Sequence, residues 1–71
     1  MKNLEINRTF ANNLKKLREQ HNLSLRLLAE QIGVSYTALS HYENCRRDPS
    51  IYKAKKIADF FSKTIDEMMS E

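Results

Sequence analysis

Two short helical patterns joined by a tight turn at the one glycine of the chain constrain it more than any other part of its sequence. Ser24 stands where a helix N-cap is expected, and Gly33 can adopt the left-handed conformation that ends a helix tightly. Ser35 follows almost at once as the next N-cap, before a pattern that runs from Tyr36 to about Asn44. The inward positions are apolar in both patterns: Leu28, Ala29 and Ile32, then Ala38, Leu39 and Tyr42. This segment, about residues 24–44, predicts a helix-turn-helix, whose second helix can lie in a DNA major groove.

The segments on either side of this motif also have helical periodicity. Asn7 is the expected cap of a first helix, Ser50 that of a fourth, and Thr64 with Glu67 has the spacing of a capping box before a short last helix. The inner stripes of the first and fourth helices are apolar: Phe10, Leu14 and Leu17, then Ala54, Ile57, Ala58 and Phe61. With only one Gly and one Pro in 71 residues, we expect an all-α fold, a compact bundle of five short helices in a single domain over residues 1–71.

Positive charge is concentrated in the body of the chain. Residues 8–56 hold ten Lys or Arg against four Asp or Glu, whereas residues 57–71 hold one Lys against four acids. This distribution is consistent with a polyanionic partner and equally with an ordinary solvated surface. Cys45 is the only cysteine, so no internal disulfide can form, and no apolar run has the length of a signal peptide or membrane span. We expect a cytoplasmic protein without a membrane partner.

An ordered set of short motifs resembles the Cro/C1-type (XRE-like) helix-turn-helix family of phage repressors and small bacterial regulators. The motifs are Leu14-x-x-Leu17-Arg18, Leu23-Ser24, Leu28-Ala29, Ile32-Gly33-Val34-Ser35, Leu39-Ser40-x-Tyr42-Glu43, Arg46-Arg47-x-Pro49 and Ile57-Ala58. The resemblance covers roughly residues 10–68. It implies a lambda-repressor-like five-helix bundle and binding to a palindromic DNA operator as a symmetric dimer.

Three positions depart from the family pattern. The family commonly has Gln, which contacts a phosphate, where this chain has Leu25, and often has Glu where it has Leu27. The third helix usually ends with Gly, where this chain has Cys45. We expect the loss of one phosphate contact, an exposed apolar side chain at Leu27, and a strained or modified turn at Cys45.

The resemblance also assigns DNA-contacting residues. The outer face of the third helix is expected to read bases through Tyr36, Thr37, Ser40 and His41. The helix start and the segment after the helix are expected to contact phosphates through Ser35, Asn44, Arg46 and Arg47. The alternative for both sets is an ordinary polar or charged surface.

Two further sets of residues are expected to have structural roles. The resemblance places Arg18 and Glu43 in a partly buried ion pair that joins the first helix to the third. Tyr52, Lys56 and Phe60 form a second stripe on the fourth helix, and Ile65 and Met69 add apolar surface nearby. A homodimer interface formed by Tyr52, Phe60, Ile65 and Met69 is therefore expected, although exposed apolar side chains are also common without a partner.

The sequence thus predicts a repressor-like transcriptional regulator that binds double-stranded DNA as a homodimer. The alternative is an antitoxin-like or adaptor module whose main partner is a protein, which Leu25 and Leu27 favour. His41 and Cys45 lie one helical turn apart, but three or four ligands are needed for zinc, and a nucleophile needs a pocket. We therefore expect no enzyme activity, metal, cofactor or small-molecule ligand.

Overall fold

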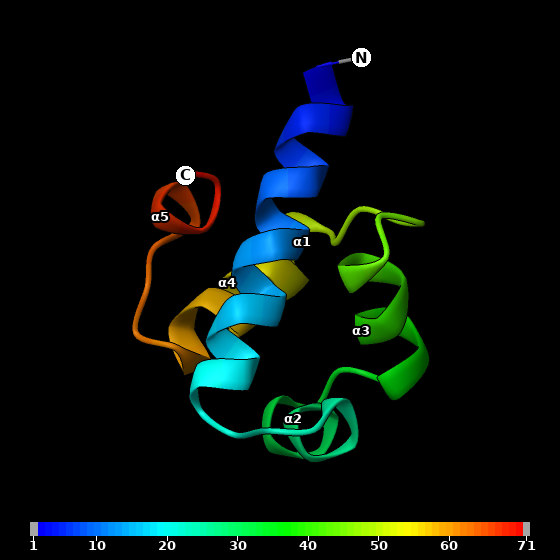
Figure 1. Cartoon of the computed structure of the whole chain (residues 1–71), viewed down its shortest axis with the longest axis vertical. Helices are drawn as coiled ribbons and strands as arrows, with labels where there is room; N and C mark the ends of the chain where they lie inside the picture. The colour runs from blue at the N-terminus through cyan, green and yellow to red at the C-terminus, as the bar shows by residue number, and fades with distance from the viewer. Residues whose placement is uncertain (1, 71) are drawn as a thin grey trace.

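The computed structural model describes the backbone of residues 2–70 and the side chains of residues 8–70. Residues 2–70 form five helices and no strand, which confirms the predicted all-α fold (Figure 1). The helices are α1 (Lys2–Gln20), α2 (Leu25–Ile32), α3 (Tyr36–Glu43), α4 (Ile51–Phe60) and α5 (Ile65–Met68).

The first helix differs from its prediction. α1 has 19 residues and begins at Lys2, so Asn7 lies inside the helix and is not its N-cap. The predicted start at Asn7 was wrong. Leu4 and Glu5 before Asn7 are good helix formers, so the helix continues through them without a cap at Asn7. At its other end α1 is followed by Asn22, which adopts a left-handed conformation (φ 56°) just past the last turn.

The other helix starts follow the predicted caps. The side chains of Ser24, Ser35 and Ser50 accept hydrogen bonds from the backbone N–H groups of residues 27, 38 and 53 at 3.0–3.1 Å. Thr64 and Glu67 form a reciprocal capping box at the start of α5. Gly33 ends α2 with φ 73°, the conformation that only glycine adopts without steric cost.

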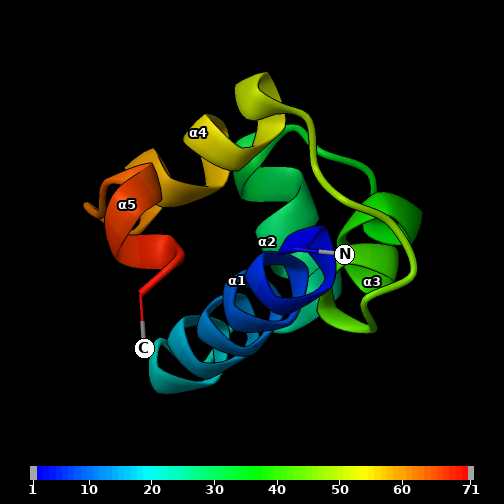
Figure 2. The same cartoon turned by 90° about the horizontal axis from the view of Figure 1, so that it is seen from above.

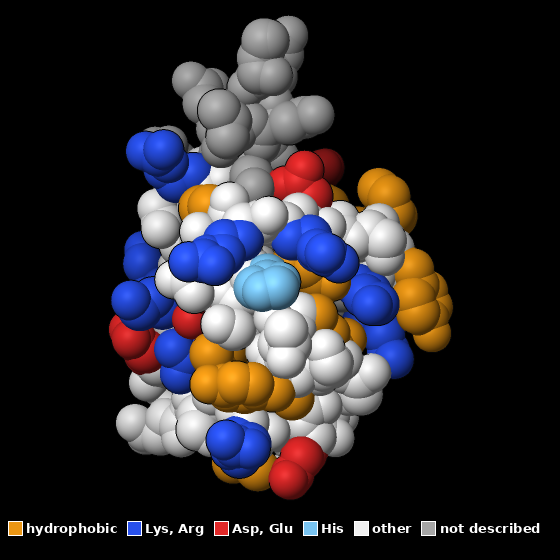
Figure 3. Space-filling model, turned by 90° about the vertical axis from the view of Figure 1, so that its right-hand side faces the viewer, with side chains coloured by type: hydrophobic (Ala, Val, Ile, Leu, Met, Phe, Trp, Pro, Cys, Tyr) orange, Lys and Arg blue, Asp and Glu red, His pale blue; other side chains and the backbone are white. Residues whose placement is uncertain are grey.

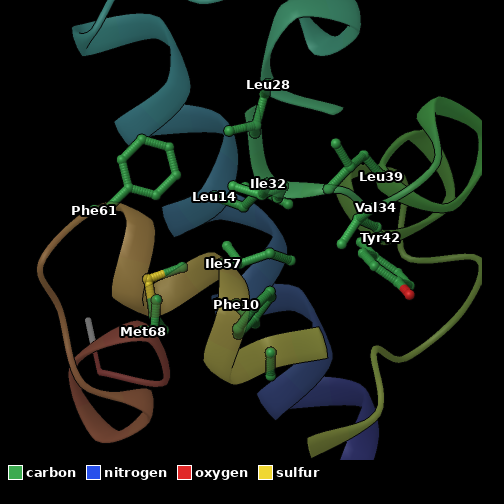
Figure 4. Packing of buried hydrophobic residues seen from close by; sticks show 12 residues of the cluster. Phe10, Leu14, Leu28, Ile32, Val34, Leu39, Tyr42, Ile57, Phe61 and Met68 are labelled. Atoms are coloured by element: carbon green, nitrogen blue, oxygen red, sulfur yellow. The ribbon is translucent and has the colours of Figure 1, made fainter. Parts of the chain in front are cut away.

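The apolar stripes meet in one core between the helices (Figure 4). Phe10 and Leu14 of α1, Leu28 of α2, Leu39 of α3 and Ile57 of α4 are almost completely buried. Around them α1 touches α3 and α5, α2 touches α3 and α4, and α4 touches α5. Viewed from above, α3 lies at the edge of the bundle, with one side packed inward and the other facing solvent (Figure 2).

Candidate nucleic-acid interface

The outer side of α3 carries the four side chains predicted to read bases. Leu39 and Tyr42 are buried against the bundle, which fixes the rotation of the helix about its axis. Tyr36 and Thr37 in the first turn are exposed, and Ser40 and His41 in the next turn are half-buried. The structure therefore places all four on the solvent side of α3 or at its border.

This side of α3 is bordered by positively charged side chains. Lys and Arg side chains border the face on several sides, with a histidine among them (Figure 3). α2, α3 and α4 also have no acidic residue in their first turns, so the positive ends of their dipoles are not neutralised. The acidic first turn belongs to α5, where Asp66 and Glu67 lie. An anion is therefore favoured near α3 more than near α5.

The end of α3 is closed by a left-handed residue that is not glycine. Cys45 has φ 58°, its N–H bonds to the Tyr42 carbonyl at 3.2 Å, and the Arg46 N–H bonds to the His41 carbonyl at 2.8 Å. These two bonds form a Schellman motif, in which glycine is usual at the Cys45 position. The modified turn expected from the sequence is thus present.

The residues predicted to contact phosphates are exposed, but two of them already have local roles, since Ser35 caps the start of α3 and Asn44 its end. Asn44 donates its side-chain amide to the Ser40 carbonyl at 2.9 Å and so helps to cap α3. Arg46 and Arg47 follow on the exposed surface of the turn. Burial raises the pKa of the Tyr42 phenol, and the positive charge of Arg47 acts in the opposite direction.

Arg18 and Glu43 join α1 to the last turn of α3. Arg18 Nε donates to Glu43 Oε2 at 2.7 Å and Nη2 to Oε1 at 3.2 Å, which is a bidentate pair. Arg18 Nη1 also donates to the Leu23 carbonyl at 2.8 Å, between α1 and α2. The hydrogen bond to the Glu43 carboxylate raises the pKa of Arg18, and burial acts in the opposite direction. One guanidinium therefore fixes three segments around the start and end of the helix-turn-helix.

One residue near this face was not singled out from the sequence. The Arg26 guanidinium, in the first turn of α2, lies over the Tyr36 ring with 5.1 Å between Cζ and the ring centroid. Tyr36 is 45% exposed. No pattern in the sequence indicates this contact, because it depends on the angle between α2 and α3.

The two leucines that depart from the family pattern have different surroundings. Leu25 is half-buried and packs against the core, so its side chain belongs to the bundle. Leu27 is exposed, as expected. Among the described residues, no group of three or more His, Cys, Asp or Glu side chains is arranged to hold a metal ion.

The predicted dimer residues divide into two kinds. Tyr52 is 69% exposed, whereas Phe60 is 37% exposed and its ring lies edge-on to the buried Phe61 ring, with 5.0 Å between the centroids. Ile65 and Met69 are half-buried and pack partly against the core. Tyr52 and Phe60 are thus the members with the most surface available to a partner.

The Helix-turn-helix family model HTH_3 matches residues 14–68 of the chain. A transcriptional regulator of this family from Vibrio cholerae has a similar crystal structure, with a TM-score of 0.80 and 30% identity over 90% of this chain and 37% of that one. In the part of the chain that the structure describes, no helix is long and apolar enough to span a bilayer.

Three relatives differ widely in length. The HTH-type transcriptional activator BcrR of Enterococcus faecalis is 44% identical over 86% of this chain, which covers 30% of BcrR. The uncharacterised HTH-type transcriptional regulator MJ0272 of Methanocaldococcus jannaschii is 40% identical over 80% of this chain and 86% of its own length. The HTH-type transcriptional regulator AnsR of Bacillus subtilis is 34% identical over 79% of this chain, which covers 48% of AnsR. The chain thus spans less than half the length of two of these relatives.

Proposed function

Because the chain belongs to the helix-turn-helix family HTH_3 of DNA-binding transcriptional regulators, a non-enzymatic class, we propose that it is a cytoplasmic protein that binds a palindromic operator as a homodimer. The family match confirms the resemblance to Cro/C1-type proteins predicted from the sequence. Operator binding by a repressor is the form of regulation we propose, although one relative, BcrR, is named an activator.

The observation that carries this proposal is the way α3 is attached at the edge of the bundle with a polar side facing outward. α3 is held by its buried side and by the bidentate pair between Arg18 and Glu43. Its opposite side presents Thr37 and His41 one helical turn apart, about 6 Å along the axis. A helix fixed in this way can insert into a major groove without losing much conformational freedom.

We assign the base contacts to the outer side of α3 and the phosphate contacts to its ends. Thr37 can contact a thymine methyl group or a base acceptor, and His41 can donate to guanine. Ser40 is half-buried next to them, and the Tyr36 ring can pack against a methyl group. Phosphates would be bound by the helix start at Ser35 and by the exposed segment Asn44, Arg46 and Arg47.

A dimer would place two α3 helices in successive major grooves. Half-sites would then lie about 34 Å apart, one turn of B-DNA. The exposed side chains of Tyr52 and Phe60 provide the apolar surface for self-association, with Ile65 and Met69 at its border.

Selection from randomised duplexes tests this proposal. The wild-type protein should enrich a palindrome, and Thr37→Ala and His41→Ala should each cost about 1–3 kcal/mol on that site and relax one base position per half-site. Arg47→Ala is the matched control, because loss of a phosphate contact should weaken all duplexes alike and reduce the salt dependence of binding.

Two results would contradict the proposal. If the wild-type protein enriches no palindrome, operator binding as a dimer is wrong, and the alternative of a protein-interaction module, for which Leu27 offers an exposed apolar side chain, takes its place. If the palindrome is enriched equally by both variants, α3 does not read the bases.

A further inference from the structure

The contact between Arg26 and Tyr36 links the first turns of the two helices of the helix-turn-helix. The distance of 5.1 Å from Arg26 Cζ to the ring centroid is within the range of about 6 Å in which a cation is attracted by an aromatic face. The two residues come from different helices, so the contact depends on the turn at Gly33 that sets α2 against α3.

This contact restrains a side chain that the core does not hold. Tyr36 is 45% exposed and lies at the start of α3, outside the buried cluster. An exposed ring on a helix surface loses rotamer freedom when a ligand packs against it, and this loss weakens binding. A guanidinium stacked on the ring reduces that loss because the ring is already oriented before DNA arrives.

Tyr36 remains 45% exposed beside this contact, so part of its surface is accessible to a second partner. A planar guanidinium covers one part of the ring, and its N–H groups point outward in its own plane. The face that contains α3 has hydrophobic side chains between Lys and Arg side chains (Figure 3). An apolar surface of this kind, bordered by Lys and Arg side chains, fits the C5-methyl group of thymine beside the phosphate backbone.

We propose that Arg26 is a positioning residue that orients the Tyr36 ring to recognise one thymine methyl group in each half-site. This inference rests on the proposed function, because it specifies how the α3 face reads one base. It differs from a plain phosphate contact by Arg26, which would add affinity for every duplex without sequence preference.

Replacement of single thymines by deoxyuridine tests the inference, because this change removes only the C5-methyl group. On the selected operator, the wild-type protein should lose about fourfold in affinity at one thymine per half-site. Tyr36→Ala and Arg26→Ala should both remove this sensitivity. Arg26→Gln is a second variant at the same exposed position, and it replaces the guanidinium by a planar but neutral end group. Arg47→Ala is the control and should keep the full sensitivity while it weakens binding to all duplexes.

A double-mutant cycle separates positioning from independent contacts. In fluorescence anisotropy titrations, Arg26→Ala and Tyr36→Ala should be coupled by about two- to fivefold in affinity, whereas Arg47→Ala and Tyr36→Ala should be additive. In the free protein, the Arg26 side-chain protons should show a ring-current shift in NMR spectra, and this shift should disappear in Tyr36→Leu.

The outcomes distinguish this inference from the proposed function. If the wild-type protein selects an operator but Arg26→Ala keeps the deoxyuridine sensitivity, or if the cycle is additive, Arg26 does not position Tyr36. If the wild-type protein selects no operator, the proposed function fails and the inference fails with it.

Discussion

α3 and α4 are built from the same local parts but are held in the molecule in different ways. Each begins with a serine cap, Ser35 or Ser50, and each ends in a Schellman motif around a left-handed residue with φ 58°, Cys45 or Ser62. Each also carries one ion pair and one cation–aromatic contact.

The difference lies in where the partners come from. The partners of α3 belong to other helices, since Glu43 binds Arg18 of α1 and Tyr36 lies under Arg26 of α2. In α4 both contacts are internal, between Lys55 and Asp59 and between Tyr52 and Lys56. Contacts within one helix stabilise that helix alone, whereas contacts between helices also fix its orientation. The helix proposed to read DNA is thus the one whose polar contacts set its position.

The ion pairs provide the strongest test of this difference. The side chains of Arg18 and Glu43 are 14% and 7% exposed, whereas those of Lys55 and Asp59 are 67% and 62% exposed. Glu43→Ala should lower the free energy of unfolding by about 3–5 kcal/mol, because it leaves the Arg18 charge without its partner in a mostly buried place. Thermal and urea unfolding measure this loss, and a Glu43→Ala melt equal to wild type would show that the pair contributes little.

The helix ends provide the second test, in which α3 and α4 should behave alike. Cys45→Gly and Ser62→Gly should each raise the free energy of unfolding by about 1 kcal/mol, because glycine adopts the left-handed conformation without a steric cost. Urea unfolding of the two variants and of their combination measures this gain. A loss of stability in Cys45→Gly alone would mean that the cysteine side chain makes a contact that outweighs the backbone strain.

The exposed ion pair of α4 should show the smallest effect. Asp59→Asn keeps the shape of the side chain and removes its charge, and it should change the free energy of unfolding by less than about 0.5 kcal/mol. Thermal melts at low and high salt check this expectation, because any contribution of the pair should be screened by salt. A loss as large as that of Glu43→Ala would remove the distinction between the two helices.

Much of the fold could be predicted because helix ends are encoded by residues close together in the chain. The caps at Ser24, Ser35 and Ser50 and the turn at Gly33 each depend on bonds over three or four residues. The predicted start of α1 was wrong because good helix formers before Asn7 let the helix continue, so Asn7 is not a cap. The assignments of individual DNA and dimer contacts stay predictions, since they concern a partner and not the chain itself.

The sequence by itself determined the caps at which α2 to α5 begin, the ends of α2 and α3, which sides of the helices are apolar, and which residues can face a groove. Only the tertiary structure decided that Arg26 covers Tyr36, that Arg18 also binds the Leu23 carbonyl, and that Leu25 packs against the core. The physical reason is the distance along the chain over which each kind of interaction acts. Capping and periodicity act within a turn or two of helix, whereas these contacts depend on the angles at which the buried stripes pack together.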